Sequence, residues 1–513
     1  MFTTVAISVL SALSGFTEVV YEVQIDVPAD IDTISRAGLF VDHYDGQRTI
    51  RVYGSSGDDA LLTAMGFDVV EIERRPFLPR SETAAKGTEP AYHTYATMTS
   101  ELQARASAYP NVTRLISLGQ SVQGRELWAL LITDNPDADE EEPEFKYIST
   151  MHGDEWTGTE MCMYFIEKLL TEYDSPDGDG PRVTQLINST AIWIVPCMNP
   201  DGFEIPTRRN ANSIDLNRSF PSYPVNFAGT MFSGEPLLIA GYEPEIQHVM
   251  TWSAQNSFVL AANFHTGALV VNYPYDYEPG VRSGFYAIAP DDDLLVDLSL
   301  RYSASNAPMY SSILFSRGIT NGSEWFAITG GMQDWNYRYL GCIENTIELS
   351  DEDMPPESQL PVFWADNEES MLKYLESVHI GAHGLVTDRV FGWPLSAQVN
   401  IDTSTQPVFT DPDEGDYYRL LLPGVYTLSY SAPGRITWRE PGVTIVDDTP
   451  VRVDVELSTG DINSDLRVDA SDVQLLVLAL LGEEIAYNAD LDGGGVAATD
   501  LQALINQVLH AGK

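Results

Sequence analysis

The chain has 513 residues, with 75 acidic and 28 basic side chains and a formal net charge of −47 at pH 7. That length exceeds what one hydrophobic core supports, so several domains are expected, and a surface this acidic argues against nucleic acid as a partner. The charge fits a protein that is kept soluble by mutual repulsion, and it also suits calcium binding or attraction of basic peptides.

The first fifteen residues, MFTTVAISVLSALSG, resemble a secretory signal peptide, because an apolar core from Val5 to Leu13 ends in small residues. The usual basic start is missing, and a buried strand is the alternative interpretation. No other stretch approaches the ~20 apolar residues of a membrane span. We therefore expect a secreted, extracellular protein without a membrane span in the mature chain.

Residues 16–75 are expected to form a small α+β domain. The runs VVYEVQIDV, RTIRVYG and FDVVEIE are typical of strands, and DIDTISRAG and DDALLTAMG are typical of short helices. Residues 76–90 are rich in Pro, Ser, Thr and charge, which predicts a linker.

Residues 91–380 alternate between helical patterns, such as TEMCMYFIEKLLTEY, and apolar strand-like runs, such as FKYIST, AIWIVPCMNP, SFVLAANFH and TIELS. Alternation of this kind predicts an α/β sheet with helices on both faces, in which ligands gather at the carboxyl ends of strands. Four polar side chains lie at or just beyond such ends: His152, Asn199, His265 and Glu348.

The pattern changes after residue 380. Residues 381–457 contain short strand-like runs separated by turn residues, including HGLVTD, AQVNID and VRVDVELS, which predicts a β-sandwich. Residues 459–511 contain two acidic loops, each followed by an amphipathic helix. The three cysteines, Cys162, Cys197 and Cys342, are too few for a disulfide framework and are expected to be small buried side chains.

The stretch MHGDEWTG raises the question of a metal site, since His152 and Glu155 are three residues apart. Zinc hydrolases use three protein ligands and leave a fourth position open. His265, at the end of the apolar run SFVLAANFH, is a candidate third ligand. For a single histidine, a hydrogen-bonded position in the core is the more common alternative.

Other residues supply further parts of a hydrolase site. Asn217 and Arg218 place an amide beside a guanidinium, which can grip a carboxylate through parallel hydrogen bonds. Glu348 ends a buried strand, where an isolated carboxylate is costly unless it has a partner or a task. A carboxylate beside a metal-bound water is a natural general base.

Together these stretches resemble the zinc metallocarboxypeptidase family, and within it the branch typified by carboxypeptidases N and E. The matching stretches span residues 91–380: HGDEWTGTE, NPDGFE, RRNANSIDLNRSFP, ANFHTGALVVNYPYD, GITNG, GGMQDWNY and CIENTIELS. The resemblance implies a mixed eight-stranded sheet between helices. The run GDYYRLLLPGVYTLSYSAPG in the following sandwich resembles the transthyretin-like domain of that branch.

The resemblance also implies a role for each matched residue. His152, Glu155 and His265 would bind Zn²⁺, and Asp215 would orient His152. Glu348 would take a proton from the metal-bound water.

Two arginines and an amide complete the implied set. Arg208, seven residues before Asp215, would stabilise the oxyanion, although its neighbour Arg209 leaves this assignment open by one residue. Asn217 and Arg218 would hold the terminal carboxylate of a peptide or protein substrate.

Two positions bear on specificity, and one departs from the family. Asp276, eleven residues after His265, and Gln333 match the pocket for the last side chain, where a carboxylate favours Lys or Arg. A turn-capping role for Asp276 is the alternative. Phe326 stands where the family has a mobile tyrosine; it keeps the ring, but it lacks the hydroxyl and weakens binding by about 0.5–1.5 kcal/mol.

The two ends of the chain resemble accessory modules. Residues 16–75 resemble the small domain ahead of secreted peptidases of this family, which implies either a pro-segment that shields the site or assists folding, or a plain accessory domain. Residues 459–511 resemble a dockerin, which implies a cohesin-like partner and Ca²⁺. The first loop offers Asp461, Asn463, Asp465 and Asp472, with Asp469 between them, whereas the second loop is one residue short.

The favoured hypothesis is a secreted zinc carboxypeptidase that removes a C-terminal Lys or Arg. Two alternatives stay open. One is a zinc amidase that trims cell-wall peptides or other C-terminal tails. The Asp276 pocket argues against tails whose last residue is acidic. The other is a non-catalytic peptide-binding scaffold, for which Phe326 is the only support.

Overall fold

The computed structural model describes residues 17–76, 92–222, 240–463, 468–483 and 495–510, together with residues 485, 489 and 491. The signal-peptide prediction, most of the linker and Asp465 lie outside the described residues. The chain forms two compact units, one made mainly of residues 1–377 and one made mainly of residues 378–513. In the described part, no helix is both long and apolar enough to cross a membrane.

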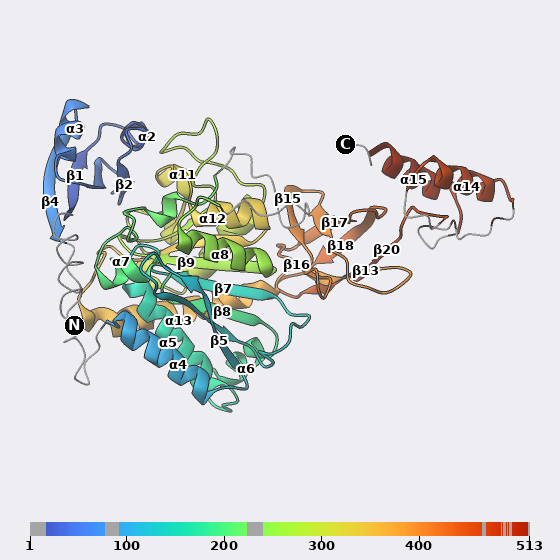
Figure 1. The fold of residues 1–513 in the computed structure, drawn as a ribbon, viewed down its shortest axis with the longest axis horizontal. Helices are drawn as coiled ribbons and strands as arrows, with labels where there is room; N and C mark the ends of the chain where they lie inside the picture. Colours follow the sequence, from blue (N-terminus) through green and yellow to red (C-terminus); the bar gives the residue numbers. More distant parts are fainter. Residues whose placement is uncertain are drawn as a thin grey trace, which may run out of the picture. The chain divides into compact units, whose positions relative to one another are not determined.

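The N-terminal domain is one four-stranded sheet with two helices, as the alternating pattern predicts (Figure 1). The strand order is β2-β3-β1-β4, and all pairs are antiparallel. Its elements are β1 (Thr17–Gln24), α2 (Ala29–Arg36), β2 (Phe40–Asp42), β3 (Thr49–Gly54), α3 (Asp58–Ala64) and β4 (Asp68–Pro76).

The central domain contains a mixed eight-stranded sheet in the order β11-β10-β12-β9-β7-β8-β6-β5, which confirms the predicted fold class. Strands β12, β9, β7 and β8 are parallel at its centre. The strands are β5 (Thr113–Gln120), β6 (Glu126–Ile132), β7 (Glu144–Ser149), β8 (Ala191–Val195), β9 (Phe258–His265), β10 (Ala268–Tyr273), β11 (Ile319–Asn321) and β12 (Ile343–Ser350).

Helices cover both faces of this sheet. Neighbouring side chains on a strand point to opposite faces, so their contacts show which helix lies on each side. On β7, Lys146 bonds to Ser253 of α8, whereas Tyr147 bonds to Met371 of α13. The helices are α4 (Tyr95–Ala108), α5 (Thr157–Glu172), α6 (Gly180–Ile187), α7 (Pro200–Glu204), α8 (Pro244–Gln255), α9 (Asp292–Ser303), α10 (Ala307–Tyr310), α11 (Gly322–Trp325), α12 (Met332–Trp335) and α13 (Leu360–Glu376).

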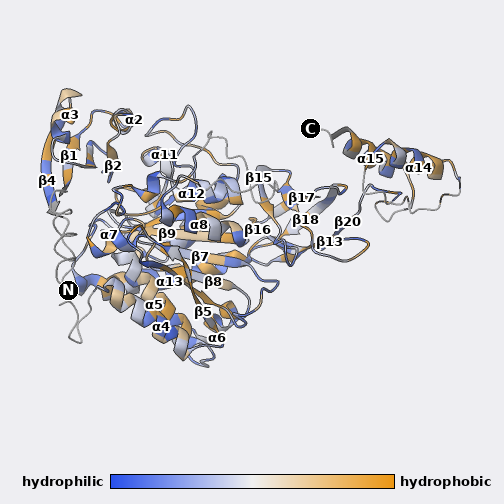
Figure 2. Cartoon of the chain, in the orientation of Figure 1, coloured by the Kyte–Doolittle hydropathy of each residue, from blue (hydrophilic) through white to orange (hydrophobic). Residues whose placement is uncertain are grey.

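Strand β9 is mostly hydrophobic, whereas β7 and β12 mix apolar with polar residues, and the helices carry both kinds as well (Figure 2). All eight residues of β9 and all eight of β12 are buried. The three cysteines are buried thiols without a disulfide, as expected.

The second unit contains two four-stranded sheets, the β-sandwich that the sequence predicts. One sheet is β16-β13-β19 with β20 also on β13, and the other is β15-β14-β17-β18. The strands are β13 (Ala382–Asp388), β14 (Gln398–Ile401), β15 (Ser404–Phe409), β16 (Asp416–Arg419), β17 (Gly424–Ser431), β18 (Trp438–Ile445), β19 (Val451–Arg452) and β20 (Val455–Leu457).

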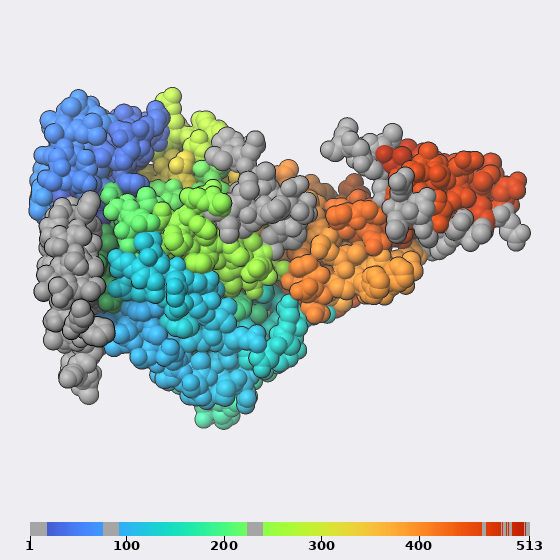
Figure 3. Space-filling model, in the orientation of Figure 1, coloured from blue at the N-terminus to red at the C-terminus, as the bar shows by residue number. Residues whose placement is uncertain are grey.

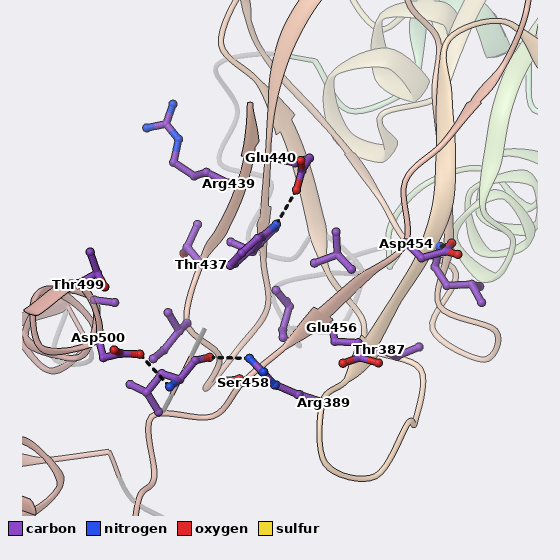
Figure 4. Close-up of a pocket in the computed structure, with 17 residues that line it drawn as sticks. Thr387, Arg389, Thr437, Arg439, Glu440, Asp454, Glu456, Ser458, Thr499 and Asp500 are labelled. Carbon is purple, nitrogen blue, oxygen red and sulfur yellow. Dashed lines mark hydrogen bonds between the residues drawn. The ribbon is translucent and has the colours of Figure 1, made fainter. Parts of the chain in front are cut away.

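The chain ends in two helices, α14 (Ala470–Leu480) and α15 (Ala498–His510), which share an apolar cluster with Ile436 of the sandwich. A pocket of about 850 Å³ separates α15 from the sandwich strands (Figure 4). Arg389 reaches across it to the carbonyl of Leu491 at 3.3 Å, and the indole of Trp438 donates to Glu440 at 3.2 Å.

Candidate active site

Three buried side chains converge at the carboxyl ends of β7 and β9. His152 and Glu155 follow β7, and His265 ends the neighbouring strand β9. Glu155 Oε1 lies 2.8 Å from His152 Nδ1, Glu155 Oε2 lies 2.7 Å from His265 Nδ1, and the two Nδ1 atoms are 3.0 Å apart. One ligand atom from each residue falls within 4.8 Å of the others. Two imidazole nitrogens and a carboxylate are a donor set that suits zinc.

The surroundings of these ligands fit a metal as well. Asp215 Oδ1 lies 3.1 Å from His152 Nε2, so the Nε2–H donates to Asp215 and the Nδ1 lone pair faces the other donors. Burial opposes ionisation of Glu155, but His152 and His265 lower the pKa of this carboxyl below its usual value. An anionic Glu155 and two imidazole lone pairs are what Zn²⁺ requires.

Glu348 stands beside the metal ligands because of the register of the sheet. In the parallel pairing of β12 with β9, Glu348 is opposite His265. Burial raises the pKa of Glu348 well above its usual value, and the negative charges of Glu155 and Asp42 raise it further. Among the described residues, no donor reaches Glu348 Oε2. A carboxylate in this position can accept a proton from water.

The two neighbouring arginines have different environments. Arg208 is almost fully buried. It donates from Nε to Asp215 Oδ2 at 2.9 Å and from Nη1 to Glu155 Oε1 at 3.5 Å. Its Nη2 meets no acceptor in the part of the chain that the structure describes. Arg209 instead donates to the carbonyl of Tyr53 at 2.8 Å and covers the ring of Phe40. Only Arg208 therefore reaches the cluster of candidate metal ligands.

Asn217 and Arg218 lie in a short 3₁₀ turn, η1 (Leu216–Arg218), that the side chain of Asp215 caps. Asn217 Oδ1 accepts from the backbone of Met332 at 3.0 Å, which fixes the amide. Arg218 donates to two carbonyls, those of Asn217 and Val41, each at 3.0 Å. It also lines a pocket of about 640 Å³.

Asp276 is buried next to these groups. Its Oδ1 accepts from Gln333 at 2.7 Å and from Asn272 at 3.2 Å, and the described residues give its Oδ2 no hydrogen bond. A Cβ built on Gly331 would lie 2.8 Å from Asp276 Oδ2 and 3.8 Å from Asn217 Oδ1, so this glycine separates the two side chains. Burial raises the pKa of Asp276 to about 6.

Asp334 is a functional candidate that the sequence did not reveal. Its two oxygens accept from the backbone N–H groups of Asp276 at 2.9 Å and Tyr277 at 3.0 Å, which fixes the loop that carries Asp276. Phe326 directly follows helix α11. Its ring packs 4.7 Å from that of Trp325, in an apolar cluster shared with the N-terminal domain.

Residues of the N-terminal domain contact the side chains of this site. The sequence did not indicate which residues make these contacts. Asp42 pairs with Arg208, and the carbonyl of Val41 accepts from Arg218. His43 Nε2 lies 3.2 Å from the carbonyl of Thr266, the residue after His265. Burial opposes ionisation of Asp42, but Arg208 and His43 lower its pKa below the usual value. Figure 3 shows the N-terminal domain in blue.

The candidate calcium ligands of the tail are only partly described. Asp472 accepts from the backbone of Ile462 at 2.8 Å, Asn463 at 3.2 Å and Asp469 at 2.9 Å. Asp500 repeats this arrangement with Leu491 and Ala497, at 2.8 Å each. The described residues of the tail form no candidate metal cluster of three or more carboxylates or other ligands.

Comparison with known proteins identifies the family. The family model for zinc carboxypeptidases matches residues 98–370. Carboxypeptidase D of Mus musculus is 39% identical over 417 residues, covering 76% of this chain and 29% of that protein. The catalytic chain of carboxypeptidase N of Homo sapiens is 38% identical over 373 residues, covering 67% of this chain and 81% of that protein. The chain thus spans less than a third of carboxypeptidase D.

Solved structures share the fold. Carboxypeptidase A from Helicoverpa armigera superimposes with a TM-score of 0.53 at 19% identity, over 70% of this chain and 96% of that one. Thrombin activatable fibrinolysis inhibitor gives a TM-score of 0.50 at 18% identity, over 70% of this chain and 98% of that one. On the matched residues and the buried His-Glu-His set, the chain belongs to the zinc carboxypeptidase family.

Proposed function

We propose that this protein is a secreted zinc metallocarboxypeptidase that hydrolyses the last peptide bond of peptides or proteins ending in Lys or Arg. The observation that carries this proposal is the buried carboxylate of Asp276, held by Gln333 beside Asn217 and Arg218. A pocket that ends in a carboxylate, next to groups that hold a terminal carboxylate, suits a basic last residue.

The reaction divides among the residues of the cleft. His152, Glu155 and His265 would hold zinc, which supplies a Lewis acid for the scissile carbonyl and lowers the pKa of water. Glu348, with its unpartnered Oε2 in the described structure, accepts the proton of the attacking water and passes it to the leaving amine.

The remaining groups position the substrate and stabilise charge. Arg208 Nη2 is available, within the described residues, to donate to the oxyanion that develops on the scissile carbonyl. Arg218 and Asn217 bind the terminal carboxylate. With the carboxylate fixed at this end, only the last peptide bond of the chain reaches Glu348, so the activity is that of an exopeptidase.

The test is release of the last residue from matched peptides that end in Arg, Lys, Phe and Glu, with and without a chelator. We expect chelator-sensitive release of Arg and Lys, lost in Glu348→Gln. Release of Phe in preference to Arg would reject the Asp276 pocket, and release of Glu would favour a zinc amidase acting on acidic tails. No release by a folded, zinc-loaded protein would favour the peptide-binding scaffold.

We also propose that the N-terminal domain is a pro-segment that shields the cleft. Asp42 of this domain pairs with Arg208, and the carbonyl of Val41 accepts a hydrogen bond from Arg218. These are the two arginines that a substrate needs. In this arrangement a peptide must displace the domain before it can bind. Removal of the domain, or a weaker contact, should therefore raise the activity.

For the ends of the chain we propose two further roles. The first fifteen residues direct secretion, which retention of a reporter in the cytoplasm would contradict. The tail binds Ca²⁺ through Asp461, Asn463, Asp465 and Asp472 and docks on a cohesin-like partner. Thermal unfolding of the tail should then shift upward with added calcium, and an unchanged transition would reject this role.

A further inference from the structure

Asp353 is a buried carboxylate of the central domain that is contacted by three side chains of the N-terminal domain. His43 Nε2 lies 2.8 Å from its Oδ1, Tyr53 donates its hydroxyl to Oδ2 at 3.0 Å, and Arg51 Nη1 lies 3.5 Å from Oδ1. Two of the three groups are basic side chains. None of the steps assigned to the cleft above uses Asp353.

The niche that His43 fills lies directly beside the metal ligands. Thr266, the residue after His265, donates its hydroxyl to the Asp353 carbonyl at 2.9 Å. A Cβ on Gly267 would stand 1.3 Å from His43 Nε2, so the imidazole lies where only a glycine leaves room. Asp353 and Gly267 thus both lie against the His43 imidazole, and the niche is the space that this side chain fills.

The order of contacts along the N-terminal segment places this niche on one side of the scissile bond. Val41 meets Arg218, which would hold the terminal carboxylate, and Asp42 meets Arg208, which would hold the oxyanion. His43 comes next in the chain, where the backbone turns into the left-handed region (φ 52°), and its Nε2 lies 3.2 Å from the carbonyl of Thr266, beside the metal ligand His265. In this order of contacts the niche follows the arginine of the oxyanion, which suits a substrate side chain one or two residues upstream of the scissile bond.

We propose that Asp353 recognises a basic side chain of the substrate one or two residues upstream of the scissile bond. His43 and Arg51, two basic side chains of the chain itself, hold that place in the shielded form. Once they leave, a lysine or arginine of the substrate pairs with Asp353. The preferred substrates are then peptides with at least two basic residues near the C-terminus. This inference rests on the proposed function and on displacement of the N-terminal domain.

The test compares kcat/KM for four peptides that end in Ala-Ala-Arg, Ala-Arg-Arg, Arg-Ala-Arg and Ala-Glu-Arg. The protein is the full chain carrying Asp42→Ala to weaken the shield, with and without Asp353→Asn. Asp351→Asn, an exposed neighbour with the same change of charge, is the matched control. Ratios between peptides are the readout, because loss of the contacts to the N-terminal domain changes all four rates by one common factor.

We expect one of the two dibasic peptides to exceed Ala-Ala-Arg by about tenfold, and Ala-Glu-Arg to fall below it. Asp353→Asn should bring the ratios close to one, while Asp351→Asn should keep them. Equal rates for all four peptides, or ratios that Asp353→Asn leaves unchanged, would overturn this inference while Ala-Ala-Arg release still upholds the proposed function. No release from any of the four would overturn both.

Discussion

Replacing Asp42 with alanine should activate the full-length protein. In the shielded form, the Asp42 carboxylate is 12% exposed and pairs with Arg208, which is 1% exposed. Breaking a buried pair by removing one partner costs about 3–5 kcal/mol. The shielded form loses this energy, whereas the open form, in which Asp42 faces water, does not. At 1.4 kcal/mol per factor of ten, a loss of about 3 kcal/mol raises the open fraction by roughly 100-fold.

The measurement is kcat/KM of the full chain on a peptide ending in Arg, at concentrations well below KM. The gain stops when the protein is fully open, so activity of a preparation from which the N-terminal domain has been cleaved sets the ceiling. Asp68→Ala, an exposed change on β4 of the same domain, is the matched control and should leave the rate unchanged. A rate for Asp42→Ala equal to that of the wild type, with the cleaved protein more active, would refute the assigned role of Asp42.

Three further predictions concern other residues. Because burial raises the pKa of Asp276 to about 6, its carboxyl is neutral below that pH and anionic above it. The preference for Arg over Phe peptides should therefore fall below pH 6 and be flat in Asp276→Asn; a constant preference from pH 5 to 8 would contradict this. Glu348→Gln should lower kcat by about 10²–10⁴ with zinc content unchanged by atomic absorption, and near-normal turnover would exclude Glu348 as the base. Asp472→Ala leaves three loop N–H groups without their acceptor, so the tail should lose ~1–3 kcal/mol and be cut faster by protease, with turnover unchanged; equal protease resistance would count against this.

Much of the site follows from where strands end in the sequence. His265 and Glu348 each close an apolar run, and a parallel sheet brings such ends to one edge. The hydrophobic pattern of the sequence does not show which strands are neighbours in the sheet. The pairing of β12 with β9, which puts Glu348 opposite His265, joins segments far apart in the chain. The resemblance to a family supplied that neighbourhood, whereas the residue pattern alone did not.

Elements and residues without a local signal were missed. Strand β10 was not predicted because ALVVNY follows β9 after a turn of two residues, and β5 is an edge strand whose residues are mostly half-buried or exposed. Asp42, Asp334 and Asp353 gave no signal either. In a chain with 75 acidic side chains, one more aspartate carries little information until its partners are known. Those partners come from other domains or distant loops.

The direction of the N-terminal segment explains why it can shield the cleft without being a substrate. In the proposed binding mode, a substrate lies with its last residue at Arg218, so its residue numbers fall with distance from that arginine. The segment Val41, Asp42, His43 runs the other way, because Val41 contacts Arg218, Asp42 contacts Arg208 and His43 contacts Thr266 beside the metal ligand His265. Arg208 also meets a side-chain carboxylate there, where a substrate would present a peptide carbonyl. In the proposed shielded form, Asp42 and the Val41 carbonyl therefore occupy the two arginines that a substrate would use, and Arg208 meets a carboxylate in place of a scissile peptide carbonyl.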